Sequence, residues 1–308
     1  MIGKDLVSFV KSFGINLLKN SSIQNDINHY EKVVDLQKKL LNSRITIPKR
    51  VWIYWDSEEI PSFICSIINN NIKRNPDYEF TILNQGNLFD FIPEVEFHRG
   101  LRAAHKADYI RLVLLEKYGG VWIDATTILV MDLNWINEVN INKSYDVIGY
   151  YRDQSTENDE FPIVETWFLA SAPQNEFISL WLKIFTPILE FGSQGFYKSL
   201  TDREDYSTLV QKLSDPSYLM LNITEQIASR SLQNVNMYLK KCEDSAFFIQ
   251  ESCGWDFNKI NYILCRQKIP LNDFPILKLT SRDRELISYY RMFNLIHEDS
   301  IIGQLIKN

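Results

Sequence analysis

The sequence predicts an α/β fold in which a mostly parallel, Rossmann-like sheet is flanked by helices and preceded by an N-terminal helical extension. Two observations indicate this. Between residues 51 and 124, short runs of β-forming residues alternate with helical patterns, as in consecutive strand–helix–strand units. The first 45 residues show a helical spacing of apolar residues instead. A chain of 308 residues, 45% of them hydrophobic, can bury a large core without disulfides.

The N-terminal segment, residues 1–45, is expected to form two helices, Ile2–Leu18 and Ser22–Leu41. Lysines lie outside the apolar face of the first helix. We expect these helices to pack on the main domain. A basic amphipathic segment resting on a membrane surface and a dimer contact are the alternatives. The apolar face of the first helix comprises Leu6, Val10, Phe13 and Leu17.

The remaining residues, 46–308, are expected to form one catalytic domain, in which residues 192–240 are a helical insertion on the acceptor side. Gly119 and Gly120 mark the end of the helix before the third strand. We predict strands at 51–55, 78–83, 121–124, 146–151, 165–170, 246–250 and 276–279. We predict helices at 61–73, 101–117, 174–191, 223–239 and 284–296.

Composition excludes several classes of function. The chain has 33 Lys and Arg against 39 Asp and Glu, a net charge of −6, so a nucleic-acid partner is not expected. The four cysteines show no metal-ligand spacing and suit a reducing compartment. No uncharged apolar run approaches 18 residues. We therefore expect a cytoplasmic protein whose only membrane contact is peripheral, at the inner face.

Three charged residues are the candidates for chemistry. Asp108 and Arg111 lie three apart on a nearly apolar helix, so both are expected to be at least half buried and to have a further partner or a ligand. Asp124 ends an apolar strand, and ligands of parallel sheets collect beyond the carboxyl ends of the strands. The alternatives are a surface ion pair and a carboxylate that caps a turn.

Three blocks of this sequence resemble a known family. They are IPKRVWIYWD at residues 47–56, the stretch from His105 to Thr127 that contains D-x-x-R and GGVWID, and TWFLA at residues 166–170. Weaker matches lie at 222–228 and 277–280. The pattern is similar to the capsular polysaccharide synthesis family of sugar transferases and to the wider D-x-D group. The resemblance spans about residues 47–280 and implies a GT-A fold with a nucleotide-sugar donor.

The resemblance also implies roles by position. Trp52, Tyr54 and Trp55 on the first strand would lie at the nucleotide, where an aromatic ring could stack on the base. Asp108 and Arg111 would bind the donor sugar. Asp124 stands at the first Asp of D-x-D, next to the ribose, the sugar and a metal ion. Retention of the anomeric configuration, by attack on the face from which the diphosphate leaves, is the expected course.

The sequence departs from the D-x-D pattern at Thr126, which replaces the second aspartate. A neutral hydroxyl is a much poorer ligand for Mn²⁺ or Mg²⁺ than a carboxylate. Two alternatives remain open. A divalent cation could bind through Asp124, the diphosphate and water, or basic side chains could neutralise the departing diphosphate. The basic candidates are Lys106, Lys278, Arg282 and Arg284.

The acceptor side is less defined in the sequence. Glu165, Thr166 and Trp167 follow a variable segment and are candidates to face the acceptor. Trp167 could stack on a sugar ring, although packing in the core is the stronger interpretation. Glu225 and Gln226 stand where related enzymes place a turn that faces the substrate.

We therefore expect a hexosyltransferase that uses a nucleotide-sugar, most simply a UDP-sugar, as co-substrate. Its acceptor would be a growing capsular or surface polysaccharide carried on a lipid. Three other classes of function compete: a nucleotide-sugar-binding protein with little or no activity, a nucleotidyltransferase, and a glycan-binding module. The acidic run after Trp55 does not suit the triphosphate substrate of a nucleotidyltransferase.

Overall fold

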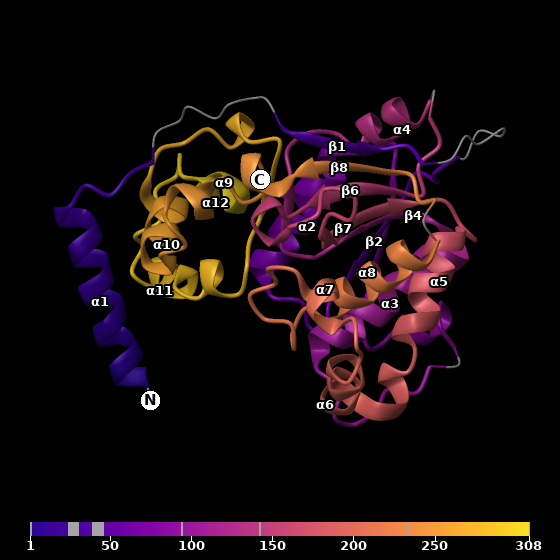
Figure 1. Cartoon of the computed structure of the whole chain (residues 1–308). Helices are drawn as coiled ribbons and strands as arrows, with labels where there is room; N and C mark the ends of the chain where they lie inside the picture. The colour runs from indigo at the N-terminus through magenta and orange to yellow at the C-terminus, as the bar shows by residue number, and fades with distance from the viewer. Residues whose placement is uncertain are drawn as a thin grey trace.

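The computed structural model describes residues 2–23, 31–38, 46–93, 95–141, 143–232 and 234–307. Its centre is a seven-stranded sheet in the order β1-β8-β6-β7-β4-β2-β3 (Figure 1). Strands β2, β3, β4, β6 and β8 run in one direction, and β1 and β7 run in the other. The mostly parallel α/β sheet predicted from the sequence is therefore confirmed. The strands are β1 (Val33–Leu36), β2 (Arg50–Tyr54), β3 (Glu79–Leu83), β4 (Gly120–Ile123), β6 (Val147–Tyr151), β7 (Val164–Ser171) and β8 (Met237–Lys241).

Helices cover both faces of the sheet, because the central strands carry apolar side chains on both faces. Val51 and Ile53 of β2 share a core with α2 (Ser62–Arg74), α10 (Phe257–Arg266) and α12 (Ile301–Lys307). Trp52 and Tyr54 point to the opposite core. That core is built by α3 (Ala103–Tyr118), α5 (Glu176–Phe185) and α8 (Met220–Leu232). The other helices are α4 (Asn134–Asn140), α6 (Ile188–Thr201), α7 (Tyr206–Val210), α9 (Phe248–Ser252) and α11 (Ile287–Met292).

A second, two-stranded sheet lies beside the end of β4. Strand β5 (Thr127–Leu129) pairs antiparallel with β9 (Ile276–Lys278), which places Thr127 opposite Lys278. Asn71 of α2 supports β5: its side chain donates to the carbonyl of Thr127 (2.7 Å) and accepts from the amide of Leu129 (2.8 Å). These bonds satisfy backbone groups that β9 leaves free, and they fix the segment that follows Asp124.

The N-terminal segment agrees with the prediction in its first half only. Helix α1 (Ile2–Leu18) packs on α11, where Phe9 is buried and stacks on Tyr289 at 5.3 Å between ring centroids. Residues 33–36 were expected to be helical, and that expectation is wrong. They form β1, an edge strand whose β-branched residues pair with β8. Residues 22–23, 31–32 and 37–38 of the expected second helix are not helical either, and its residues 24–30 and 39–41 lie outside the described residues.

The first strands and helices of the main domain agree with the prediction, and the second half contains several corrections. The expected helix 174–191 is divided into α5 and α6 at Pro187, which has no amide hydrogen to continue the helix. Residues 237–239, expected to end a helix, belong instead to β8, which lies in the sheet beside β6. Residues 246–250 were expected to be a strand, but Phe248–Ser252 is helix α9. The expected closing helix 284–296 is reduced to α11.

Candidate active site

A cavity of about 920 Å³ opens at the edge of the sheet where β2, β4 and β6 end and β7 begins. Each of these strands contributes a polar or aromatic side chain to the lining. Parallel strands bring their carboxyl ends to one edge, where an α/β sheet leaves room for a ligand. The lining residues at the four strand ends are Tyr54, Asp124, Arg152 and Glu165.

A turn of two glycines leads from α3 into β4 and so positions Asp124. Gly119 has φ of +62° and Gly120 has φ of +103°, a region that residues with a side chain rarely adopt. A Cβ atom at Gly119 would lie 2.5 Å from the backbone nitrogen of Pro173, and one at Gly120 would lie 2.6 Å from the carbonyl oxygen of Arg50. This tight turn reverses the chain between α3 and β4, and so brings Asp124 back to the side of the sheet where Asp108 lies.

The three charged residues singled out by the sequence form one network. The guanidinium of Arg111 donates to Asp108 through one nitrogen and to Asp124 Oδ1 through the other, at 3.1 Å. The indole nitrogen of Trp122 also donates to Asp124 Oδ1, at 3.0 Å. Arg111 lies over the Trp122 ring, 4.9 Å from its centroid. Asp108 and Arg111 are both buried, and Arg111 has the further partner that the sequence required, Asp124.

Lys278 completes the network from the opposite side of Asp124. Its Nζ donates to Asp124 Oδ2 at 2.7 Å and to the Thr126 hydroxyl at 2.8 Å. Both oxygens of the Asp124 carboxylate are therefore engaged by a positively charged side chain. Thr126, which stands where the D-x-D pattern has its second aspartate, holds the ammonium group through a neutral oxygen.

The electrostatic environment keeps Asp124 ionised. Burial alone would raise the pKa of Asp124, but Lys278 and Arg111 outweigh it and lower the pKa to about 2. Burial lowers the pKa of Lys278, and the contact with Asp124 works against that change. Asp124 therefore carries its charge throughout the physiological pH range.

The aromatic residues of the first strand separate into two groups. Tyr54 and Trp55 line the cavity, and the Tyr54 hydroxyl donates to Asp56 at 2.5 Å. Trp52 does not, and its expected role at the nucleotide is corrected. Its side chain is fully buried in the core under α3, and its indole nitrogen donates to the carbonyl of Gly119 at 2.8 Å. Trp52 and Tyr54 lie on the same face of β2, but only Tyr54, at the carboxyl end of the strand, reaches the cavity.

The four basic candidates are likewise divided. Lys278 and Arg284 line the cavity. Lys106 lies outside the lining and pairs with Asp56 at 3.7 Å, so its expected substrate contact is not supported by its position. Arg282 also lies outside it, over the ring of Phe257 at 5.8 Å. Each of the two is adjacent in the sequence to a residue that lines the cavity.

Glu165, Thr166 and Trp167 all line the cavity beside the charged network, because β7 pairs with β4 and the amide of Asp124 donates to the carbonyl of Trp167 at 2.9 Å. Burial raises the pKa of Glu165 to about 7, although Arg152 opposes the rise. Trp167 packs in the core: it is 4% exposed and stacks on Tyr150 at 5.0 Å between ring centroids. Only the part of its surface that reaches the wall is available to a ligand.

Glu225 and Gln226 do not form the turn expected of them. They lie within α8, are fully buried and are absent from the cavity lining. Glu225 accepts from the hydroxyl of Ser229, one turn later on the same helix, and from Gln226. Their role is structural, since the buried carboxyl is satisfied by its own helix.

Sequence reasoning missed an aromatic platform in the cavity lining beside Arg152. The guanidinium of Arg152 lies 5.0 Å from the ring centroid of Phe247 and 4.8 Å from that of Trp255. Trp255 is 40% exposed and has φ of +59°, an unusual backbone conformation for a residue with a large side chain. Its neighbour Gly254 and the acidic Asp256 were readable as a turn, but nothing in the sequence placed that turn at the cavity.

The donor set at Asp124 does not suit a divalent cation. Among the described residues, no cluster of three or more His, Cys, Asp or Glu side chains could hold a metal ion. The carboxylate that the D-x-D resemblance assigns to the metal already binds Arg111 and Lys278. A cation would have to displace an ammonium group, with Thr126 as its second, neutral ligand.

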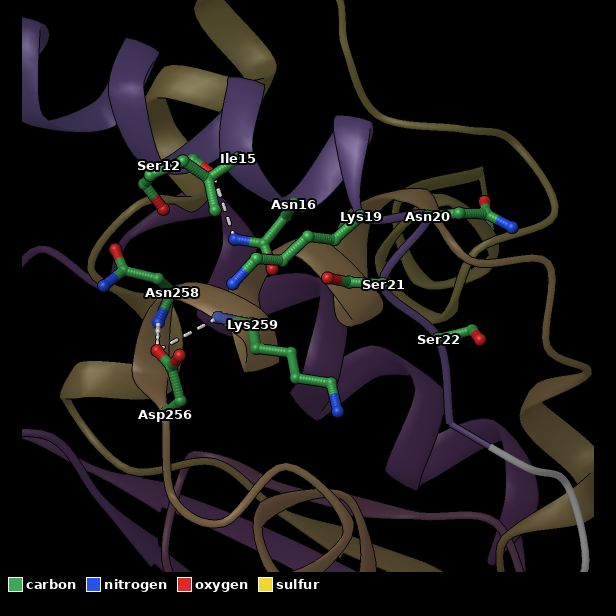
Figure 2. Close-up of a pocket in the computed structure, with 10 residues that line it drawn as sticks. All are labelled: Ser12, Ile15, Asn16, Lys19, Asn20, Ser21, Ser22, Asp256, Asn258 and Lys259. Carbon is green, nitrogen blue, oxygen red and sulfur yellow. Dashed lines mark hydrogen bonds between the residues drawn. The ribbon is translucent and has the colours of Figure 1, made fainter.

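A second cavity, of about 580 Å³, lies between the end of α1 and the start of α10 (Figure 2). Its acidic residue, Asp256, accepts from the amides of Asn258 (3.0 Å) and Lys259 (3.4 Å) and so caps α10. The lysines drawn in Figure 2, Lys19 and Lys259, have no acidic partner among the residues shown there. The cavity therefore has the character of a helix junction.

Comparison with known proteins gives consistent results. The chain is 28% identical over 176 residues to the O-glycosyltransferase braB of Annulohypoxylon truncatum, covering 50% of this chain and 41% of that protein. It is 22% identical over 157 residues to inositol phosphoceramide mannosyltransferase 3 of Schizosaccharomyces pombe, covering 49% of this chain and 38% of that protein. The chain thus spans about two fifths of the length of these relatives.

Solved structures that the chain matches include the PaToxG glycosyltransferase, with a TM-score of 0.35 and 12% identity over 100% of this chain and 98% of the other. The ligand-free glycosyltransferase domain of the YGT toxin has a TM-score of 0.39 and 10% identity over 82% of this chain and 90% of the other. The model of the capsular polysaccharide synthesis protein family matches residues 10–190, more than half of the chain. The charged network around Asp124, apart from Lys278, lies within that range, and the chain belongs to the capsular polysaccharide synthesis protein family.

Proposed function

We propose that the protein is a glycosyltransferase that moves a hexose from a nucleotide-sugar, most simply a UDP-sugar, to a glycan acceptor with retention of configuration. The observation that carries this proposal is the network around Asp124 at the carboxyl edge of the sheet. An ionised carboxylate there accepts hydrogen bonds from ribose or sugar hydroxyls. The curated relatives are glycosyltransferases by name, which supports the same class of reaction.

The cavity lining has two neighbouring parts suited to two substrates, a donor wall around Asp124 and an acceptor wall around Glu165. Tyr54 and Trp55 offer aromatic surface to a base, next to Asp124 and the basic side chains. Glu165 and Trp255 both lie beside Arg152, where a hydroxyl and a sugar ring could bind. In the reaction the bond from the anomeric carbon to the diphosphate breaks, and an acceptor hydroxyl oxygen bonds to that carbon. The departing diphosphate takes the electron pair and the hydroxyl proton.

The acceptor is proposed to be a capsular or surface polysaccharide carried on a lipid. Helix α1 supports contact with a membrane surface, because its outward face is apolar: Leu18 is 88% exposed and Val10 is 56% exposed. Val7 and Leu17 extend the same stripe, next to Lys11. Among the described residues, no helix is both long and apolar enough to cross a membrane. We propose that the protein works in the cytoplasm and contacts the membrane peripherally.

The direct test is release of the nucleoside diphosphate from a panel of UDP-, GDP- and CMP-linked sugars, with and without a lipid-linked glycan from a capsulated bacterium. We expect release of UDP from a UDP-hexose, and faster release when the acceptor is present. The product's anomeric configuration is then read by NMR. If no nucleotide-sugar is consumed and none binds, the protein is not a transferase, and a glycan-binding module becomes the better description.

A further inference from the structure

The position that a divalent cation would take in a D-x-D site is filled by a side chain of the protein itself. Lys278 Nζ lies 2.7 Å from Asp124 Oδ2 and 2.8 Å from the Thr126 hydroxyl, so it bridges the first and third residues of the motif. We propose that the Lys278 ammonium replaces the metal ion and binds the donor diphosphate directly, so that the protein works without a divalent cation. This inference rests on the proposed function.

The replacement of aspartate by Thr126 fits a monovalent cation. Two carboxylates suit a doubly charged ion, whereas one carboxylate and one hydroxyl match the single charge of an ammonium group. An ammonium group has three N–H donors. Asp124 and Thr126 accept two of them, and among the described residues no other group accepts the third, which leaves it for a phosphate oxygen.

The backbone holds Lys278 in place before any ligand binds. Strand β9 pairs Lys278 with Thr127, and the amide of Leu279 donates to the carbonyl of Thr126 at 3.1 Å. The side chain of Gln250 donates to the carbonyl of Lys278 at 2.7 Å. The residue is only 8% exposed. A cation fixed in a dry wall acts on a developing negative charge without reorganisation, which is the arrangement that stabilises a departing diphosphate.

Arg284 adds a second cation on the same wall. It lines the cavity after Lys278 and is held by a hydrogen bond of 3.1 Å from its Nε to the carbonyl of Thr280. The two residues belong to one segment, 278–284, that closes on Asp124. A diphosphate carries charge on two phosphoryl groups, so a lysine and an arginine on one wall suit it better than a neutral ligand.

The first test uses the unaltered protein. We expect isothermal titration calorimetry to give the same affinity for UDP in EDTA and in Mn²⁺, within about twofold. A tenfold or greater gain with Mn²⁺, reversed by EDTA, overturns the inference and leaves the transferase proposal standing. Absence of binding by UDP, GDP and CMP in both conditions overturns the transferase proposal, and the inference with it.

The second test compares UDP with uridine, because the difference between their affinities reports on the phosphates alone. In Lys278→Met, we expect the affinity for UDP to fall at least tenfold while that for uridine stays within twofold. Lys240→Met is the matched control. The side chains of Lys240 and Lys278 are both 11% exposed. Lys240 lies on β8, away from the cavity, and its ammonium group bonds one carboxylate, that of Glu31, at 2.6 Å. That variant should keep both affinities. An equal loss for UDP and uridine in Lys278→Met, or no loss, contradicts the proposal.

The third test builds the metal site that the protein lacks. The double variant Thr126→Asp with Lys278→Ser restores two carboxylates and removes the ammonium group. We expect its UDP binding to be weak in EDTA and at least tenfold stronger in Mn²⁺. Binding that stays strong in EDTA shows that no cation is needed at this position, and it refutes the assigned role of Lys278.

Discussion

Two carboxylates on neighbouring strands of the same cavity have opposite environments. Asp124, after β4, is held between Arg111 and Lys278, and its pKa is lowered to about 2. Glu165, at the start of β7, is dominated by burial, and its pKa is raised to about 7. Strands β4 and β7 are hydrogen-bonded to each other, so the difference arises from the surrounding side chains and not from depth in the fold. The comparison separates a permanently charged donor wall from an acceptor wall that titrates near neutrality.

The largest effect is expected from breaking the donor wall. Asp124→Asn removes the charge between Arg111 and Lys278, and transfer should fall by at least about 100-fold, as when a preorganised electrostatic group is lost. The rate of UDP release under saturating substrates measures this. Asp132→Asn, an exposed aspartate outside the cavity lining, is the control and should keep its rate. Near-normal turnover in Asp124→Asn would remove that residue from the mechanism.

A smaller effect is expected on the acceptor wall. An ionised Glu165 can accept a hydrogen bond from an acceptor hydroxyl and orient it. Because its pKa is about 7, kcat/KM for the acceptor should rise as the pH increases through 7. Glu165→Gln should lower kcat/KM about tenfold and abolish that step. Asp124, ionised throughout, should add no step between pH 5 and 9.

The titration of Glu165 depends on specific neighbouring charges. Arg152 and Lys278 face Glu165 and favour its charged form, whereas Glu243 disfavours it. A profile that keeps the same step in Glu165→Gln would assign the titration to another group. The contrast between the two walls would then no longer rest on Glu165.

The aromatic platform sharpens the same comparison. Trp255→Ala removes an exposed ring from the acceptor wall without touching the network at Asp124. We expect the KM for the acceptor to rise about three- to tenfold, in line with the loss of one stacking contact, and the KM for the donor to stay unchanged. A change confined to the KM for the donor would contradict this expectation and place the aromatic platform on the donor wall.

The smallest effect on activity, and a clear one on stability, is expected at Glu225. Burial raises its pKa from 4.5 to about 7, as at Glu165, but Glu225 lies in α8 outside the cavity. Between pH 4.5 and 7 the folded protein keeps this proton while the unfolded chain has lost it. The free energy of unfolding therefore falls as the pH rises through that window. Glu225→Gln should reduce that fall, measured by urea denaturation at pH 5 and 8, and leave kcat unchanged.

The parts of the fold that the sequence predicted depend on local signals. The first strand, the helix that follows Pro61 and the glycine turn after α3 can each be read from adjacent residues. Strand β8 could not be read this way. Its residues Met-Tyr-Leu-Lys-Lys have no strong β pattern, and their conformation is decided by pairing with β6 and β1.

The same distinction holds for the site. Asp108, Arg111 and Asp124 could be grouped because one helix and one turn connect them. The role of Trp52 was misread because Trp52 and Tyr54 share one face of β2, and nothing local says how far along the strand the cavity reaches. Trp255 reaches the cavity through a turn whose direction depends on tertiary packing. The contact from Lys278 to Thr126 joins residues 152 positions apart, beyond any local pattern.

That long separation has a consequence for how the protein becomes active during synthesis. A ribosome delivers the chain from its N-terminus, so β2, β3 and β4 emerge and can pair well before the segment that carries Lys278, which follows Asp124 by 154 residues. Until then Asp124 lacks its ammonium partner. The nascent chain thus has a central sheet before it has a donor site. A stalled or prematurely terminated product that ends before β9 should be inert toward nucleotide-sugars.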